Sequence, residues 1–181
     1  WYRSRGLGDV YKRQFEALAK PFLRPYKLSG ENTTQKIKKI QKKLNLNEEQ
    51  GFIVTCSDSI CWLANIRGED VPNSPLMNCY AIVHHNHVCI YSMRDAYKDS
   101  AIELRKNVKL KHFDQFFKDI KKLKKILFVP TNTPFILKKN IIGRSIKSEK
   151  VCDVISLFKA KKNRIELKGS ITVSYTHLTL P

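Results

Sequence analysis

The sequence lacks the features that would assign it at once to a common functional class. No apolar run approaches the roughly 20 residues that a membrane helix needs. No phosphate-binding P-loop, dinucleotide Gly-x-Gly-x-x-Gly, Gly-x-Ser-x-Gly elbow or His-Glu-x-x-His motif is present. Internal repeats are missing as well. The sequence therefore does not predict a membrane-spanning protein or a zincin. It also does not predict a nucleotide-binding enzyme of these types or a serine hydrolase with this elbow.

Acidic residues are scarce, because 16 Asp and Glu stand against 34 Lys and Arg, for a formal net charge of +18. Such a balance is typical of chains that bind nucleic acid or an anionic surface. Most of the cations are lysines, however, whereas arginine is the residue that reads phosphates and bases with a bidentate fork. We favour solvated helix faces as the explanation. A lysine-rich α/β nucleic-acid-binding module without catalysis is kept as the alternative function.

Paired cysteine motifs are absent too. The five cysteines are irregularly spaced and contain no Cys-x-x-Cys pair, which favours free thiols in a reducing, cytoplasmic compartment over disulfides or a zinc ribbon. The only metal-like grouping is His84, His85 and His87 with Cys89. Strand alternation would place His85 and His87 on one face. A solvated hairpin turn is the favoured interpretation, with a metal site as the alternative.

Both ends of the chain look foreign to it. The strings DVYKRQ (Asp9–Gln14) and VSYTHL (Val173–Leu178) are translations of the two strands of a transposon end used to prepare sequencing libraries. We therefore expect a piece of a longer protein with non-native ends. The expected divisions are a non-native segment at 1–14, a connector from a preceding domain at 15–27, a domain at 28–150, a linker and the start of a further domain at 151–172, and a second non-native segment at 173–181.

Hydrophobic periodicity predicts an α/β domain with a mixed β-sheet flanked by helices. The amphipathic stretch TTQKIKKIQKKLN predicts a helix ending near Asn45. The runs at 79–83 and 88–93, joined by His-His-Asn-His, predict a hairpin. Further strands are expected at 51–57, 108–111 and 125–129, with 125–129 an inner strand, and further helices at 59–65, 99–106, 114–124 and 135–142.

The stretch DSICWLANIRGEDVPNSP, Asp58–Pro75, combines residue types that an ordinary core segment does not need. Ser57 or Asp58 is expected to cap a short helix that Asn65 and Gly68 end, with Gly68 free to take a positive φ. The helix should bury Leu63, and Trp62 is interpreted as core because it sits within an apolar helical turn.

After this helix, Pro72 and Pro75 stiffen a polar loop, and such loops on rigid scaffolds often carry function. Arg67 is the candidate functional residue, because a guanidinium on a rigid loop can orient a carboxylate. Asn65 and Asp70 would hold the loop. The structural alternative is that Arg67 and Asp70 pair with each other and fix its shape.

The string DSICWLANIRGEDVPNSPLMNCYAIV resembles the middle domain of three-domain Xaa-Pro aminopeptidases, the aminopeptidase P group of the creatinase and prolidase superfamily. YKLSGENTTQKIKKIQKKL is similar to the opening of that middle domain, and FKAKKNRIELKGS to the start of the catalytic domain. The residues that carry the central match are Asp58, Trp62, Leu63, Asn65, Ile66, Arg67, Gly68, Asp70, Pro72, Pro75, Tyr80 and Ala81.

The resemblance implies a creatinase N-terminal-domain-like fold and an accessory, capping role for 28–150. The parent would be a metallopeptidase, a hydrolase that removes the N-terminal residue from peptides with proline second. Its catalytic domain would hold two Mn²⁺ through two Asp, one His and two Glu. We identify none of those ligands here, so we expect no catalytic residue, no metal and no activity from this chain alone.

The resemblance also implies partners. The expected partner is the parent's own catalytic domain, with Xaa-Pro peptides as substrates of the whole enzyme and no membrane contact. Asn65, Arg67, Gly68 and Asp70 would form the loop that faces this domain or the substrate. A homodimer is left open for the parent. So is a creatinase-like relative with another small substrate, or a relative without activity.

Overall fold

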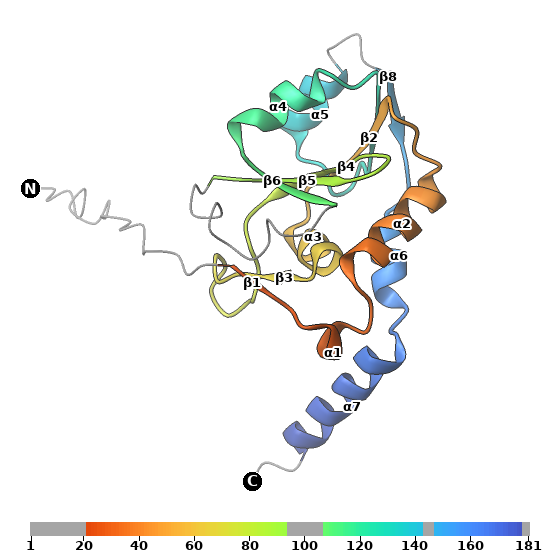
Figure 1. The fold of residues 1–181 in the computed structure, drawn as a ribbon. Helices are drawn as coiled ribbons and strands as arrows, with labels where there is room; N and C mark the ends of the chain where they lie inside the picture. Colours follow the sequence, from red (N-terminus) through yellow and green to blue (C-terminus); the bar gives the residue numbers. More distant parts are fainter. Residues whose placement is uncertain (1–20, 94–106, 143–146, 179–181) are drawn as a thin grey trace, which may run out of the picture.

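The computed structural model describes residues 21–93, 107–142 and 147–178 (Figure 1). The predicted helix at 99–106 lies outside these residues. The strands are β1 Phe22–Leu23, β2 Gln50–Val54, β3 Ile66–Arg67, β4 Tyr80–Val83, β5 Val88–Ser92, β6 Val108–His112, β7 Lys125–Phe128 and β8 Lys147–Lys150. The helices are α1 Tyr26–Ser29, α2 Thr33–Leu44, α3 Ser57–Ala64, α4 Asp114–Ile120, α5 Phe135–Ile142, α6 Val154–Ala160 and α7 Arg164–Leu178.

The sheet is mixed, as predicted. Its six strands run in the order β6-β5-β4-β2-β7-β8. Strand β4 is antiparallel to β2 and β5, while the β2–β7, β7–β8 and β5–β6 pairs are parallel. The predicted hairpin is β4–β5, and the predicted inner strand β7 lies between β2 and β8. A second, two-stranded ribbon pairs β1 with β3.

Helices cover both faces of the sheet (Figure 1). A hydrophobic core is buried on each face. On one face α2, α3 and α6 bury a core that includes Ile40, Ile60 and Ile155. On the other face α4 and α5 pack over Tyr91 with Phe116 and Leu137. An α/β sheet needs such cover on both faces because its inner strands are apolar on both sides.

Several predicted boundaries and contacts were wrong. Helix α3 already begins at Ser57, so neither Ser57 nor Asp58 is its N-cap, and Cys56 takes that position without a side-chain cap bond. Asn65, with φ of 51°, ends the helix in the left-handed region, whereas Gly68 does not adopt a positive φ. A Cβ on Gly68 would lie 3.0 Å from Met77 Cβ, so this glycine permits a close approach instead.

Helix α4 ends at Ile120 rather than at residue 124. Its buried aromatic residue is Phe116, and Phe117 is half-buried beside it. None of the helices in the described part of the chain is long and apolar enough to cross a membrane.

Candidate functional site

The loop that follows α3 is anchored at its first residue. Asn65 is 4% exposed, and its Nδ2 donates to Glu31 O at 2.8 Å. Its Oδ1 accepts from Lys36 Nζ at 2.7 Å. Asn tolerates the left-handed backbone that this position requires, so one residue both ends α3 and fixes the start of the loop.

Arg67 lies half-buried against the end of α3. Its Nη1 donates to Ile66 O at 2.7 Å and to Cys61 O at 3.2 Å, and the second of these carbonyls belongs to the last turns of the helix. Burial, and then the nearby Arg24, lower the pKa of Arg67 from its ordinary value. The guanidinium is thus held in one orientation. Its predicted contact with a carboxylate stays a prediction, and so does the alternative pairing with Asp70.

The rest of the loop closes on itself. Asp70 Oδ2 accepts from Asn78 N at 2.8 Å, and Asp70 N donates to Leu76 O at 3.0 Å. Ser74 N donates to Val71 O at 3.1 Å around the turn that holds Pro72. Pro72 and Pro75 are exposed. These bonds tie the two arms of the loop together, in the manner of a compact surface loop whose ends are close.

The remaining residues of the motif have different surroundings. Leu63 is buried in the core, and Tyr80 packs its ring against Phe113 and Phe116 at 5.4 Å between ring centroids. Asp58 is exposed and forms an ion pair with Lys159 on α6. Side chains of the motif therefore contact both the sheet and the helices around it.

Trp62 was interpreted as a core residue, and the structure shows other surroundings. It is half-buried, and its indole Nε1 donates to Glu166 Oε1 at 3.2 Å. Lys36 Nζ lies 4.1 Å from the centroid of the Trp62 ring, within the range of a cation–π contact. Trp62 is thus the link between α3 and the start of α7.

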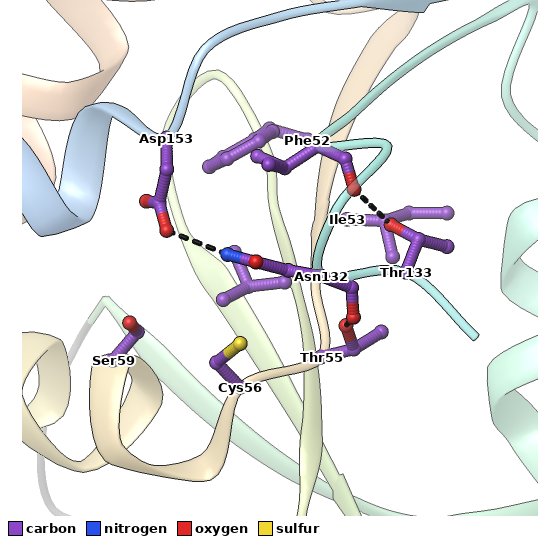
Figure 2. Close-up of a pocket in the computed structure, with 10 residues that line it drawn as sticks. Phe52, Ile53, Thr55, Cys56, Ser59, Asn132, Thr133 and Asp153 are labelled. Carbon is purple, nitrogen blue, oxygen red and sulfur yellow. Dashed lines mark hydrogen bonds between the residues drawn. The ribbon is translucent and has the colours of Figure 1, made fainter.

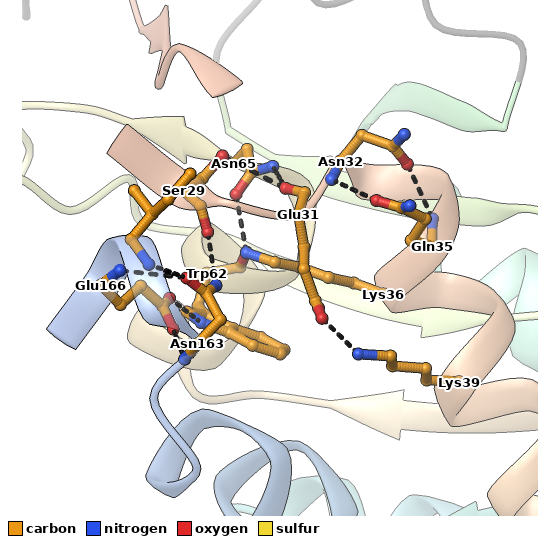
Figure 3. Close-up of polar contacts among 11 residues, drawn as sticks. Ser29, Glu31, Asn32, Gln35, Lys36, Lys39, Trp62, Asn65, Asn163 and Glu166 are labelled. Atoms are coloured by element: carbon orange, nitrogen blue, oxygen red, sulfur yellow. Dashed lines mark hydrogen bonds and ion pairs between the residues drawn. The ribbon is translucent and has the colours of Figure 1, made fainter. Parts of the chain in front are cut away.

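These contacts belong to a polar cluster that we call the α7 junction, drawn in Figure 3. It joins the segment before α2, the end of α3 and the beginning of α7. Sequence reasoning missed it, because its central residue, Lys36, stands among similar lysines in KIKKIQKK and carries no motif. Its members are Ser29, Glu31, Lys36, Trp62, Asn65, Asn163 and Glu166.

A small cavity lies where β2 and β7 end, a position at which α/β sheets commonly bind ligands (Figure 2). Its polar groups bond to one another: Thr55 Oγ1 donates to Asn132 O at 2.7 Å, and Asn132 Nδ2 donates to Asp153 Oδ2 at 2.7 Å. The volume is about 10 Å³, which corresponds to about one water molecule. An organic substrate does not fit there.

The histidine cluster is arranged differently from the prediction. His84 and His87, not His85 and His87, share a face and stack at 4.5 Å between ring centroids. The cause is the two-residue turn, in which His84 N donates to His87 O at 2.8 Å and places the two residues opposite each other. His85 instead pairs its Nδ1 with Leu46 O at 2.7 Å.

The surroundings of His84 and His87 disfavour the charged form of each ring. Burial lowers the pKa of His84 to about 4, assisted by His87 and Lys111. Burial also lowers the pKa of His87, followed by the charges of Lys109 and Lys111. With Cys89, the potential ligand atoms lie within 4.8 Å of one another. Two His and one Cys are not the two Asp, one His and two Glu of the resemblance, so the dinuclear metal does not fit the residues that the structure describes.

Comparisons with known proteins assign the class. A family model described as the Creatinase/Prolidase N-terminal domain matches residues 13–166. The chain therefore belongs to the creatinase/prolidase N-terminal domain family. The mixed sheet with helices on both faces is also the fold of solved structures described as an X-prolyl aminopeptidase and an Xaa-Pro dipeptidase.

Three relatives illustrate the likeness. The "Probable Xaa-Pro aminopeptidase P" of Pyrenophora teres f. teres (strain 0-1) is 27% identical over 163 residues, which cover 83% of this chain and 25% of that protein. The protein of the same name from Pyricularia oryzae (strain 70-15) is 32% identical over 167 residues, covering 80% and 26%. The chain spans about a quarter of the length of these curated relatives.

The third relative is a solved structure, the X-prolyl aminopeptidase from Caenorhabditis elegans, described as a cytosolic enzyme with a di-nuclear active site. It superposes with a TM-score of 0.73 at 21% identity, over 90% of this chain and 28% of that one. At this identity the likeness shows the fold of the chain.

Proposed function

We propose that the chain is the non-catalytic accessory domain of a cytoplasmic Xaa-Pro aminopeptidase, a manganese-dependent metallopeptidase. The observation that carries the proposal is the family match over residues 13–166, together with relatives of that name of which the chain spans about a quarter. The groups that would bind two Mn²⁺ and cleave the peptide belong, in this proposal, to a further domain of the same protein. The role of the described domain is to cap the entrance to that active site.

The geometry of the loop supports this role. Its arms are tied together by backbone and Asp70 bonds, and Arg67 is fixed at its base. A stiff loop that bears a fixed cation is suited to positioning a carboxylate, because little conformational entropy is lost when the cation and the carboxylate make contact. Arg67 is therefore the residue through which we expect the domain to act on the active site.

The test compares the chain alone with a version extended by the downstream sequence of its own transcript. With Mn²⁺ present, the extended protein should release the first residue of an Xaa-Pro peptide and leave a matched Xaa-Ala peptide intact. The chain alone should cleave neither. An extended protein that leaves Xaa-Pro peptides uncut with Mn²⁺ refutes the peptidase, and activity of the chain alone refutes the accessory role.

Arg67→Ala in the extended protein separates the two interpretations of this residue. If Arg67 orients a carboxylate of the substrate or catalytic domain, kcat/KM falls at least about tenfold, equivalent to ~1.4 kcal/mol of transition-state stabilisation. If Arg67 only shapes the loop, the melting temperature falls while kcat/KM of the folded enzyme stays close to wild type. Asp70→Ala serves as the comparison, because it weakens the loop without removing the cation.

The distribution of lysines does not favour the nucleic-acid alternative. Some exposed lysines lie on α2, including Lys38 and Lys42, and others lie on or directly after α4, including Lys118 and Lys121. The two helices cover opposite faces of the sheet. A single footprint needs its cations on one face or stripe. Salt-dependent binding of the chain to DNA or RNA would revive this alternative.

A further inference from the structure

Lys36 is the least expected member of the α7 junction. Its side chain is 1% exposed, although lysine is almost never buried unless it is paired. Its Nζ donates to Trp62 O at 2.9 Å and to Asn65 Oδ1 at 2.7 Å. One ammonium thus contacts both the last turn of α3 and the first residue of the loop at 65–75.

Trp62 carries this contact onward to α7. Its ring lies under the Lys36 ammonium, and its Nε1 donates to Glu166 Oε1. The other carboxylate oxygen, Oε2, accepts from Asn163 N at 3.1 Å, while Asn163 Oδ1 accepts from Glu166 N at 3.0 Å. This reciprocal pair is a capping box with Asn163 as N-cap, so Trp62 binds the carboxylate that completes the cap of α7.

A second contact fixes the start of α7 to the end of α1. Asn163 Nδ2 donates to Ser29 O at 2.8 Å. It can approach so closely because residue 30 is glycine: a Cβ there would lie 2.3 Å from Asn163 Oδ1. Gly30 has a φ of 69°, a conformation that glycine adopts without strain. The backbone between α1 and α2 is therefore shaped to receive Asn163.

We propose that Lys36, Trp62 and Glu166 form a clamp that couples the loop at 65–75 to the first turn of α7. Lys36 is then a positioning residue. The inference rests on the proposed function, in which the loop faces the catalytic domain and α7 leads into it. The buried ammonium holds the loop directly and α7 through Trp62, so the orientation of the loop is tied to the path by which the chain enters its catalytic domain.

Hydrogen exchange of the present chain tests the clamp without any enzymatic assay. Lys36→Met, Trp62→Phe and Glu166→Gln should each speed the exchange of amides 167–172 in α7 at least tenfold. The matched control is Lys39→Met, which removes an exposed lysine of the same helix that pairs with Glu31. This control should leave α7 exchange within about twofold of wild type.

The decisive measurement asks whether a substitution at α7 changes hydrogen exchange in the loop at 65–75. Glu166 contacts α7 and Trp62 but not the loop in the bonds described above, so a purely local role for Glu166 predicts no change there. The clamp predicts that Glu166→Gln also speeds the exchange of Asp70 N. It further predicts that the double variant Lys36→Met with Glu166→Gln exchanges these amides little faster than either single variant. Trp62→Phe, which keeps a ring in place, guards against the outcome that Lys36→Met fails to fold.

Two results would overturn the clamp. One is that Lys36→Met lowers the melting temperature but leaves α7 exchange unchanged, which makes Lys36 a local support. The other is that Lys39→Met matches Lys36→Met. Absence of Xaa-Pro cleavage by the extended protein would refute the proposed peptidase without altering either exchange result, so the two failures are distinguishable.

Discussion

The environment of Lys36 changes the chemistry of its side chain. Burial lowers its pKa to about 8, against the opposing attraction of Glu166 and Glu31 and with the help of Arg67 and Arg24. The neighbours Lys38, Lys39, Lys42 and Lys43 on the same helix are exposed. Burial therefore brings the titration of Lys36 into a readily studied range of pH.

This pKa predicts a fluorescence titration. In a Trp1→Phe background, the emission of Trp62 should change with a midpoint near pH 8, because the ammonium beside its ring loses its proton there. The Lys36→Met variant should lack the step. A step that persists in Lys36→Met assigns the titration to another group and contradicts the prediction.

The free energy of unfolding should depend on the same titration of Lys36. The folded pKa of about 8 is below the 10.5 of ordinary lysine, so between these values the unfolded chain binds more protons than the folded one. The contribution of Lys36 to the free energy of unfolding therefore rises with pH over this window. Denaturation in urea at pH 7.5 and 10 should show this rise in wild type relative to Lys36→Met, and an equal or opposite slope would contradict it.

Two glycines give a matched pair of substitutions. Gly30→Ala should destabilise the chain by about 1–2 kcal/mol, because its φ of 69° is unfavourable for alanine and the new Cβ would meet Asn163. Gly169→Ala lies within α7 with nothing near its Cβ, and should stabilise that helix by up to about 1 kcal/mol. Thermal denaturation of both variants checks the opposite signs.

At the scale of elements, helix α2 depends on its first residues. Asn32 Oδ1 accepts from Gln35 N at 2.8 Å and Gln35 Oε1 accepts from Asn32 N at 2.9 Å, a complete capping box. Asn32→Ala should cost about 1 kcal/mol of stability. Thr34→Ala, at an exposed position of the same turn, is the control and should change little. Equal effects of the two variants would show that the cap contributes nothing particular.

Sequence patterns predicted the elements that have a strong apolar period. Helix α2, the β4–β5 hairpin and the inner strand β7 were found because their buried residues recur at the spacing of a helix or a strand. Strand β8, with the sequence KSEK, was missed because it is exposed along its whole length and is defined only by its pairing with β7.

The candidate site was predictable only in part. The loop at 65–75 was located from its unusual mixture of residues, and Asn65 was expected to hold it. The role of Lys36 could not be predicted, since only the approach of Trp62 and Asn65 in the folded chain distinguishes it from its neighbours. Likewise the turn geometry, not strand alternation, decides which histidines meet.

At the scale of the whole molecule, one sheet supports both cores. Ile40 on α2 and Ile126 on β7 are 0% exposed in the cores on opposite faces. Because both cores share the same strands, the domain should unfold in one transition. Ile40→Ala and Ile126→Ala should each lower its stability by about 2–5 kcal/mol. Circular dichroism and Trp62 fluorescence should give the same midpoint, and two separated transitions would contradict this.

The margins of the sheet have a consequence for how the domain behaves in solution. Among the described strands, β6 and β8 lie at the two edges, and both carry lysines, with all four residues of β8 exposed. A strand from another molecule that tried to extend the sheet would have to desolvate these ammonium groups and bring like charges together. The domain should therefore resist aggregation through its own edges, so that it can be handled at high concentration without the rest of its protein.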